Sequence, residues 1–584
     1  MNRLWNLKNP DNKTVELLSS QLHISPELST FLVNRDVNDL NNAGVFLNPT
    51  LDKLPNPFLL KDMEKTTDRI IESIESGEKI VVYGDFDCDG VTSTTILYSF
   101  LKSVDAKVEF YIPERIEEGY GINLKSIKGL ASNGAGLIIS TDCGISENEL
   151  VENCKDLNLD FLITDHHTVP ETKPDAFSIV NPQQKDCEYP FKEICAAGVV
   201  FNLIMALRQK LRDKGHFEYI QEPNLARYLD LVAIGTIADS MPIVGVNRIF
   251  VHNGLKEIPK TKRLGLLALL KNDKTTYTAR DVSFGIAPKI NATGRVGRAS
   301  NAVRLLIESE QTEVESLMQI IDQDNRRRRM IQDKVSAEAF VQADSLMKEN
   351  PDRNSLVLSC TDWHPGVIGI VASKMVEKYN RPCSVISING EIGKGSLRTT
   401  NGINLFEVLK ECDSSLIQFG GHAGAAGITI KLEEIDNFKD SFERSIEFYD
   451  YDFTETIDVD MEIAFDSVNS DLIDDIKKIE PFGKNNEVPV FLTKNLEVKS
   501  AETFNPKIKK KASPEKEGKH LRLVLSLDNQ TRKGIWFNYS KDILEGQKVD
   551  ILLNKKVNVV YTIQKDTYKG NTNITLMIRD ITTA

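Results

Sequence analysis

Short apolar runs alternate with helix-like patterns along residues 79–182. Three of these runs, at residues 80–83, 137–141 and 161–164, contain β-branched side chains and have the length of buried strands. Residues 91–101 have the pattern of a crossover helix between two of them. Strands that alternate with helices predict an α/β domain built on a parallel sheet.

A much longer helical pattern occupies residues 312–350, which contain no glycine or proline. Val314, Leu317 and Ile321 keep helical spacing, whereas residues 322–329 are polar on every side and end in four consecutive arginines. This pattern predicts a long helix that connects two domains and is solvated in the middle. The arginines are either a solvated face of that helix or part of a path for nucleic acid.

The flanking segments have patterns of their own. Residues 225–239 are apolar, and their periodicity fits a helix and a strand equally well. Residues 354–450 predict a second α/β unit with two glycine-rich loops, at 393–398 and 420–427. From about residue 455, about five short strands and a lysine-rich loop at 507–519 predict a small barrel of the OB type.

Together these patterns predict an α/β protein of several domains. In chain order they are a helical preface (1–60), the domain with the parallel sheet (61–250), a helical region that includes the long helix (251–350), the second α/β domain (351–452) and the barrel (455–584).

Composition narrows the class of protein. The chain has 584 residues, of which 41% are hydrophobic and 27% charged, and this is typical of a globular protein with several cores. No apolar run approaches the roughly 20 residues of a membrane helix, and the N-terminus lacks the layout of a signal peptide. Eight scattered cysteines without a CxxC pair predict free thiols in a cytoplasmic protein. The net charge of −13 is unusual for a nucleic-acid-binding protein, but local basic patches are sufficient for phosphate binding.

Acidic and imidazole side chains stand where the predicted strands end. Because the carboxyl ends of parallel strands share one edge of a sheet, these groups are expected to meet there. Crowded carboxylates repel one another unless cations neutralise them, and oxygen ligands mixed with histidine suit Mn²⁺ or Mg²⁺. The alternative is that the aspartates only form turns and cap helices. The residues concerned are Asp85, Asp87, Asp89, Asp142, His166, His167 and Asp239.

Four motifs around these residues resemble those of the DHH phosphoesterase superfamily. They are DFDCDG at 85–90, TDCG at 141–144, DHH at 165–167 and GTIAD at 235–239. GGH at 420–422 with AAG at 425–427 resembles the signature of the partner domain, DHHA1. Further segments resemble the RecJ branch of single-strand-specific exonucleases, namely residues 54–58, 112–115, 118–121, 287–292, 294–295 and 481–483.

The resemblance implies 5′-to-3′ degradation of single-stranded DNA to mononucleotides with two ions of Mn²⁺ or Mg²⁺. It implies metal ligation by Asp85, Asp87, Asp142, His166 and Asp239, with Asp142 bridging the ions. Asp89 either ligates a metal or caps the turn at Gly90. His167 contacts the scissile phosphate or protonates the leaving oxygen; alternatively, it is a supporting residue held by a carboxylate.

The resemblance also implies contacts to the DNA and to other proteins. Arg115, Arg295, Ser396, Arg398 and His422 are implied to bind phosphate, and the arginine forks suit a terminal 5′-phosphate. The barrel is implied to hold the strand. Aromatic residues available there for base stacking are Phe504, Trp536, Phe537 and Tyr561, although burial in the core is the simpler interpretation of each. A role in DNA recombination and repair, a single-strand-binding protein and a RecQ-type helicase as partners, and a monomeric state are expectations of the same kind.

Two other functions fit part of the sequence. The first is a small-substrate relative, such as a nano-RNA hydrolase, a nucleotide phosphatase or a pyrophosphatase, and residues 455–584 argue against it because such relatives lack the barrel. The second is a DNA-binding scaffold that has lost its metals, and the intact acidic motifs argue against that.

Overall fold

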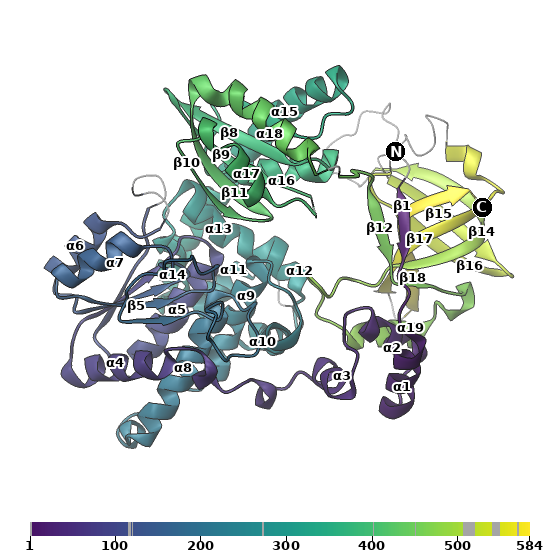
Figure 1. The fold of residues 1–584 in the computed structure, drawn as a ribbon. Coiled ribbons are helices and arrows are strands. Elements are labelled where there is room, and N and C mark those ends of the chain that lie inside the picture. The colour runs from purple at the N-terminus through teal and green to yellow at the C-terminus, as the bar shows by residue number, and fades with distance from the viewer. Residues whose placement is uncertain are drawn as a thin grey trace. The chain divides into compact units, whose positions relative to one another are not determined.

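The computed structural model describes residues 3–114, 118, 121–270, 274–400, 402–449, 451–505, 520–539, 549–568 and 571–583 (Figure 1). The chain divides into two units. One consists of Met1–Leu54, Pro242–His252 and Thr454–Ala584, and the other of Pro55–Met241 and Asn253–Phe453. Within the described residues, no helix has the length and apolar character that crossing a membrane requires.

The second unit begins with the predicted parallel sheet. Its five strands run in the order β3-β2-β4-β5-β6, and all neighbours are parallel. Helices α4, α5 and α8 pack on one face, and α6 and α7 cover the other, so the central strands are buried on both sides. The elements are α4 (Met63–Ser76), β2 (Ile80–Gly84), α5 (Cys88–Ser103), β3 (Val108–Tyr111), α6 (Leu124–Ser132), β4 (Leu137–Thr141), α7 (Asn148–Asp156), β5 (Asp160–Thr164), β6 (Ser178–Val180) and α8 (Ala196–Asp213).

A helical region follows the sheet. The segment whose pattern fitted both a helix and a strand forms a short 3₁₀ turn and a buried helix, η4 (Leu225–Tyr228) and α9 (Leu229–Ala238). The predicted long helix is confirmed as α15 (Gln311–Glu349), which contacts α11, α13 and α14 as well as elements of the second sheet. Its middle is not solvated on every side as predicted, because Asn325 is buried and Asp322 pairs with Lys289 of α13. The remaining helices are α10 (Gly245–Glu257), whose residues up to His252 belong to the first unit, η5 (Ile258–Lys260), α11 (Leu264–Leu269), α12 (Ala279–Asp281), η6 (Val282–Ile286), α13 (Ala287–Val296) and α14 (Ser300–Ile307).

The second α/β domain has a mixed sheet in the order β10-β11-β9-β8-β7, in which only β7 and β8 are parallel. Helix α16 and part of α15 pack on one face, whereas α17 and α18 pack on the other. The elements are β7 (Leu356–Cys360), α16 (Ile368–Tyr379), β8 (Cys383–Asn389), β9 (Ile392–Arg398), α17 (Leu405–Glu411), β10 (Gln418–His422), β11 (Ala425–Lys431) and α18 (Ile435–Glu447).

The prediction of two glycine-rich loops in this domain was wrong. Residues 393–398 lie within β9, and residues 420–427 are mostly in the paired strands β10 and β11. Packing explains the glycine at position 395, because a Cβ there would lie 2.6 Å from Cγ1 of Ile428 on the neighbouring strand. Glycine here serves close packing between side chains of the sheet and does not mark a turn.

The first unit contains the predicted barrel. Strands β14, β15, β16, β18 and β17 follow one another in the sheet, and pairing of β14 with β17 closes it. Trp536 and Tyr561 are buried in its core, as the simpler interpretation predicted, whereas Phe537 is 50% exposed. The elements are β12 (Thr456–Val459), β13 (Met461–Glu462), α19 (Ser470–Lys478), β14 (Phe491–Phe504), β15 (His520–Leu527), β16 (Gln530–Trp536), β17 (Lys556–Tyr568) and β18 (Asn571–Thr583). The lysine-rich loop lies outside the described residues.

The N-terminal segment differs from the expected helical preface. It begins with a strand, β1 (Leu4–Leu7), which pairs in parallel with β12. Its helices α1 (Asn12–Leu22), α2 (Pro26–Val33) and α3 (Leu40–Leu47) contribute to the hydrophobic core of the barrel unit, where the rings of Phe31 and Phe491 lie 5.9 Å apart. The two ends of the chain therefore share one core. The five domain boundaries drawn from the sequence stay a prediction.

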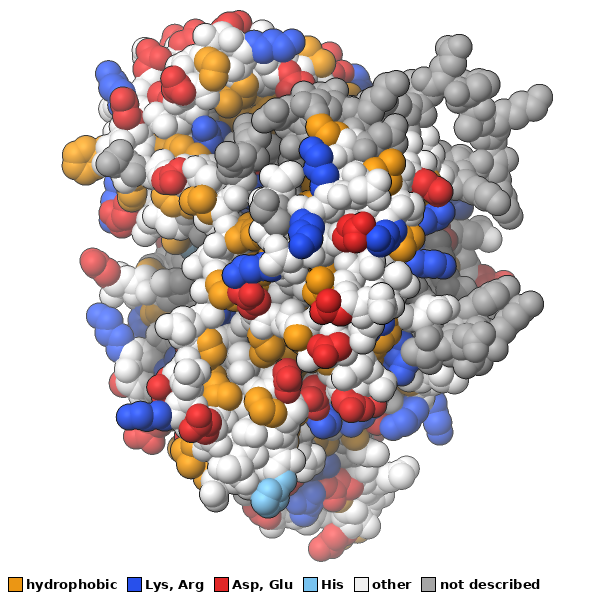
Figure 2. All heavy atoms as spheres, turned by 90° about the vertical axis from the view of Figure 1, so that its right-hand side faces the viewer, with side chains coloured by type: hydrophobic (Ala, Val, Ile, Leu, Met, Phe, Trp, Pro, Cys, Tyr) orange, Lys and Arg blue, Asp and Glu red, His pale blue; other side chains and the backbone are white. Residues whose placement is uncertain are grey.

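Positively and negatively charged side chains are interspersed on the face shown in Figure 2, so the excess negative charge of the chain is not concentrated on this face. All eight cysteines are free thiols, as expected from their scattered positions.

Arg248 is buried in the first unit and should be important for its stability. Its guanidinium donates hydrogen bonds to the backbone carbonyls of Phe46, Ile479 and Glu480 at 2.7, 3.0 and 2.8 Å. We expect Arg248→Met to leave these buried carbonyls without donors and to cost about 3 kcal/mol. Hydrogen exchange of residues 470–480 should become roughly a hundredfold faster. Arg579→Met, at an exposed position of the same unit, is the control, and equal protection in both variants would contradict the prediction.

Candidate metal centre

The acidic motifs meet at the carboxyl edge of the parallel sheet. Asp85 follows β2, Asp142 follows β4, and His166 and His167 come just after β5, while Asp239 caps the C-terminus of α9. Three groups of these side chains bring one ligand atom each within 4.8 Å of one another. The groups are Asp85 with Asp87 and Asp142, Asp142 with His166 and His167, and Asp89 with His166 and Asp239.

The turn from β2 into α5 is shaped by a glycine and a cap. Oδ1 of Asp87 accepts the backbone N–H groups of Asp89 and Gly90 at 2.8 and 3.0 Å, which starts α5. A Cβ at position 90 would lie 2.4 Å from the carbonyl oxygen of Asp85, so only glycine lets the helix approach the strand end this closely. This turn brings the carboxylates of Asp85 and Asp87 close to that of Asp142.

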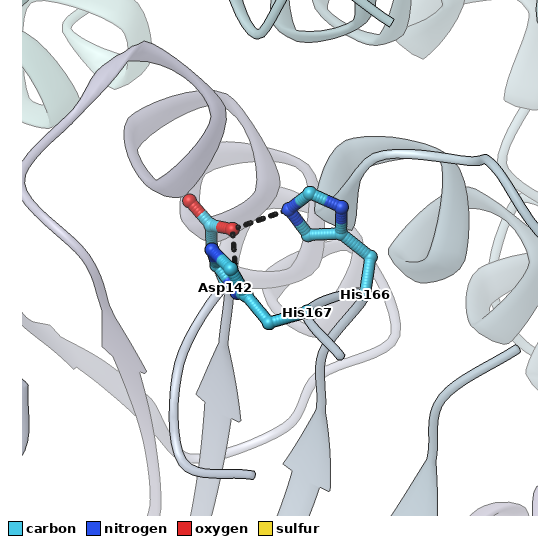
Figure 3. Close-up of side chains that lie close together, drawn as sticks. All are labelled: Asp142, His166 and His167. Atoms are coloured by element: carbon cyan, nitrogen blue, oxygen red, sulfur yellow. Dashed lines mark hydrogen bonds and ion pairs between the residues drawn. The ribbon is translucent and has the colours of Figure 1, made fainter. Parts of the chain in front are cut away.

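Asp142 is at the centre of the cluster. Its Oδ1 lies 3.1 Å from Nε2 of His166 and 4.0 Å from Nδ1 of His167 (Figure 3). Its backbone has φ of 67°, a left-handed conformation in which aspartate is tolerated better than most residues. Two of the three ligand groups share this carboxylate, which is the arrangement expected of a bridging ligand.

Asp165 orients both histidines, a role that the sequence reasoning did not assign although the residue lies in the DHH motif. Its Oδ1 accepts the backbone N–H groups of His166 and His167 and the ring Nδ1–H of His167, at 2.7, 3.0 and 2.7 Å. Burial opposes protonation of His167, but the hydrogen bond to Asp165 outweighs it and raises the pKa of His167 to about 9. The supporting carboxylate considered for His167 is therefore present.

Asp89 has a second role that the sequence did not indicate. Its two carboxylate oxygens accept the backbone N–H groups of Ala196 and Ala197, at 2.6 and 3.0 Å, at the start of α8. The turn at Gly90, which Asp89 was considered to cap, is capped by Asp87. Gly235 permits this arrangement, because a Cβ there would lie 2.6 Å from Oδ1 of Asp89.

The electrostatics of the cluster fit divalent cations. Burial and the charge of Asp87 raise the pKa of Asp89 to about 7, and burial with the neighbouring aspartates raises the pKa of Asp142 well above its usual range. Burial and the charge of His167 lower the pKa of His166 to about 4, so its ring is neutral and offers a lone pair. Carboxylates that repel one another beside a neutral imidazole are a suitable ligand set for Mn²⁺ or Mg²⁺.

Three of the five predicted phosphate contacts, Arg295, Ser396 and Arg398, lie near the start of α16. Nη1 of Arg295 donates to the carbonyl of Gly366 at 3.1 Å, and Nη1 of Arg398 donates to Oγ of Ser396 at 3.2 Å. A Cβ on Gly369 would lie 3.0 Å from Oγ of Ser396 and 3.2 Å from Nη2 of Arg398, so this turn contacts both. His422 is exposed on β10, two strands from Arg398 in register. Arg115 lies outside the described residues.

A pocket of about 300 Å³ joins this region to the metal cluster, since Arg295 and Ile370 line it together with Ala238 and Ser240, the neighbours of Asp239. Arg328 from the run of arginines also lines it and is held by Asn325 and Gln332 at 2.6 Å. These contacts between distant segments could not be read from the sequence.

Comparison with known proteins agrees with this geometry. Family models match residues 79–236 (DHH family, N-terminal domain), 352–447 (DHHA1 domain) and 459–580 (RecJ OB domain). The chain is 34% identical over 460 residues to the single-stranded-DNA-specific exonuclease RecJ of Haemophilus influenzae, with 76% of this chain and 80% of that protein covered. The chain belongs to the RecJ family.

Two other RecJ proteins are also similar to this chain, one in sequence and one in structure. Over 498 residues the chain is 38% identical to the single-stranded-DNA-specific exonuclease RecJ of Bacillus subtilis, which covers 84% of this chain but 61% of the relative. The match thus spans about three fifths of that relative's length. A crystal structure of RecJ from Thermus thermophilus in complex with Mn²⁺ superposes with a TM-score of 0.83 at 26% identity, covering 100% of this chain and 80% of that one. The predicted architecture of DHH, DHHA1 and OB domains is confirmed.

Proposed function

We propose that this protein is a metal-dependent exonuclease that degrades single-stranded DNA from the 5′ end and releases mononucleotides. The observation that carries the proposal is the convergence of Asp85, Asp87, Asp142, His166 and Asp239 at one sheet edge, in a chain that also has the RecJ barrel. The named activity of the RecJ relatives supports it.

The cluster would hold two divalent ions, Mn²⁺ or Mg²⁺. Asp85 and Asp87 would bind one ion, His166 and Asp239 the other with support from Asp89, and Asp142 would bridge them. When bound, such a pair activates water and stabilises both oxygens of an in-line displacement.

The residues of the chain position the substrate and move a proton. Asp165 keeps His167 protonated and oriented, so that His167 is suited to contact the scissile phosphate and to give a proton to the leaving oxygen. Arg295, Ser396 and Arg398 would hold the terminal 5′-phosphate, and this anchor would set the first linkage over the ions. His422 and Arg115 remain proposed phosphate contacts of the same site.

The competing functions are distinguished by one experiment. Strands labelled at the 5′ end are incubated with Mn²⁺, with and without a chelator, and the products are separated by length. Mononucleotides from the 5′ end that disappear with the chelator support the exonuclease. Hydrolysis of dinucleotides alone would indicate a small-substrate enzyme, and binding without any cleavage would indicate a scaffold.

Several finer proposals rest on family membership alone. They are a role in DNA recombination and repair in the cytoplasm, action as a monomer, and cooperation with a single-strand-binding protein and a RecQ-type helicase.

Arg398→Ala tests the anchor for the 5′-phosphate. We expect loss of the bidentate contact to cost about 2 kcal/mol, so that degradation of 5′-phosphorylated strands slows about thirtyfold while 5′-hydroxyl strands are affected much less. The measurement is kcat/KM on both substrates. Lys394→Ala, at an exposed position of the same strand, should change neither. Equal losses on both substrates would remove Arg398 from this role.

A further inference from the structure

A second and larger pocket, of about 860 Å³, lies elsewhere in the unit that contains the parallel sheet. It is formed by the C-terminal end of α5, the junction of η4 and α9, residues 257–264 and the end of α14. Lys102 in the last turn of α5 lines this pocket, whereas Asp89 in the first turn of α5 belongs to the metal cluster. Thirteen residues of helix separate them by about 20 Å, so the two sites are distinct.

Arg263 gives the pocket its most unusual feature. Its side chain is only 11% exposed, and its Nε lies 3.5 Å from Oδ2 of Asp230. Among the described residues, its buried Nε and Nη2 have no hydrogen-bond acceptor within bonding geometry. Its guanidinium packs 5.3 Å from the centre of the Tyr228 ring. Buried donors are normally satisfied, so a guanidinium of this kind that lines a pocket is suited to an anionic ligand.

The other charges of the pocket also favour an anion. Lys102, Arg227 and Lys262 are exposed and form no ion pair with any described residue. The acidic side chains are engaged already. Asp230 accepts from Thr261 at 2.9 Å, Glu257 pairs with Lys260 at 2.8 Å, and Glu308 accepts the backbone N–H groups of Ser309 and Glu310. The lining carries five cationic side chains against these three carboxylates, so net positive charge remains available in the pocket.

Size and apolar lining indicate what kind of anion fits. A volume of about 860 Å³ is within the range of small-molecule and cofactor sites. Tyr98, Leu264, Leu306 and Ile307 supply apolar surface for a planar group. One buried guanidinium suits a single phosphate group better than the extended backbone of a long strand, which is usually held by a row of exposed cations.

We propose that this pocket binds a mononucleotide, with its phosphate on Arg263, the exposed cations Lys102 and Lys262 assisting, and its base against the apolar wall.

The test is calorimetric titration of the full chain with dAMP in the Arg398→Ala background, which removes a principal contact of the proposed phosphate site near the metals. We expect one dAMP per chain, at least tenfold weaker binding of deoxyadenosine, and competition by inorganic phosphate. Lys102→Glu with Lys262→Glu should weaken dAMP binding at least tenfold. Lys125→Glu with Lys128→Glu, the same charge change on α6 across the sheet, should leave it unchanged.

Arg263 is tested together with its partner. Arg263→Gln with Asp230→Asn avoids a lone buried carboxylate and should also weaken dAMP binding at least tenfold; if this variant does not fold, the exposed lysine pair decides. Absence of dAMP binding in the Arg398→Ala protein, or binding that the lysine pair does not change, would overturn the proposal. A 5′-phosphorylated tetranucleotide distinguishes the source of the phosphate. If the lysine pair weakens its binding more than that of dAMP, the pocket holds a strand end and the mononucleotide proposal is wrong.

Discussion

Asp142→Asn should lower the rate of DNA hydrolysis at least a thousandfold, about 4 kcal/mol of lost transition-state stabilisation. Asp142 is shared by two of the three ligand groups, so replacing its charged oxygen disturbs both proposed ion positions at once. Asparagine is preferred to alanine because the backbone at this position has φ of 67°, where alanine would add strain of its own. The measurement is kcat on a 5′-phosphorylated strand with Mn²⁺.

A matched control separates chemistry from folding. Asp105 has nearly the same backbone conformation, with φ of 60°, and is exposed at a turn, so Asp105→Asn should retain full activity. Circular dichroism and retained DNA binding would show that the Asp142→Asn protein is folded. Near-normal cleavage by that folded protein would contradict the proposal of two ions bridged by Asp142.

Much of the fold followed from local patterns. The strands β2, β4 and β5 are continuous apolar runs because both faces of a parallel sheet are buried, and such runs are easy to recognise. The position of each aspartate after a strand then places the metal cluster, because parallel strands end at one edge. Helix α15 was predictable for a similar reason, since thirty-nine residues without glycine or proline leave few other structures.

The remaining features depend on contacts between segments that are distant in sequence. Asp89 caps α8 more than one hundred residues later, and Asn291 accepts the backbone N–H of Cys88 at 2.8 Å. No local pattern signals either bond. The glycines of β9 predict a loop by their local pattern, because the side chains of the neighbouring strand that require them are not visible in the sequence. The N-terminal strand was missed because its partner, β12, lies at the other end of the chain.

An aromatic cluster on the barrel gives the second large expected effect. Phe504, His520 and Phe537 pack edge to face or tilted, with ring centres 5.0–6.4 Å apart, and the guanidinium of Arg522 lies 5.0 Å from the Phe504 ring. Phe537 is 50% exposed, and Arg522 is exposed as well. A stacked base contributes about 1–3 kcal/mol on such a platform. We expect Phe504→Ala, Phe537→Ala and Arg522→Ala together to weaken binding of long single strands several hundredfold, about 3–4 kcal/mol.

This substitution is a better test of the barrel than deleting it. Truncation near Phe453 would remove Phe491 and its neighbours from a core to which Leu18, Leu28 and Phe31 also contribute, so a loss of binding could reflect misfolding of the N-terminal helices. In the full chain, affinity is measured against strand length and salt, with Lys494→Ala, which is exposed on β14, as the control. The triple variant should still degrade very short oligonucleotides, since the barrel contributes no residue to the ligand groups found in the described part of the chain. The slope of log affinity against log salt concentration should become shallower by roughly 0.7, because Arg522 no longer neutralises a phosphate of the strand. If the triple variant binds long strands as tightly as the Lys494→Ala protein, the bases do not stack on this cluster and the strand is held elsewhere.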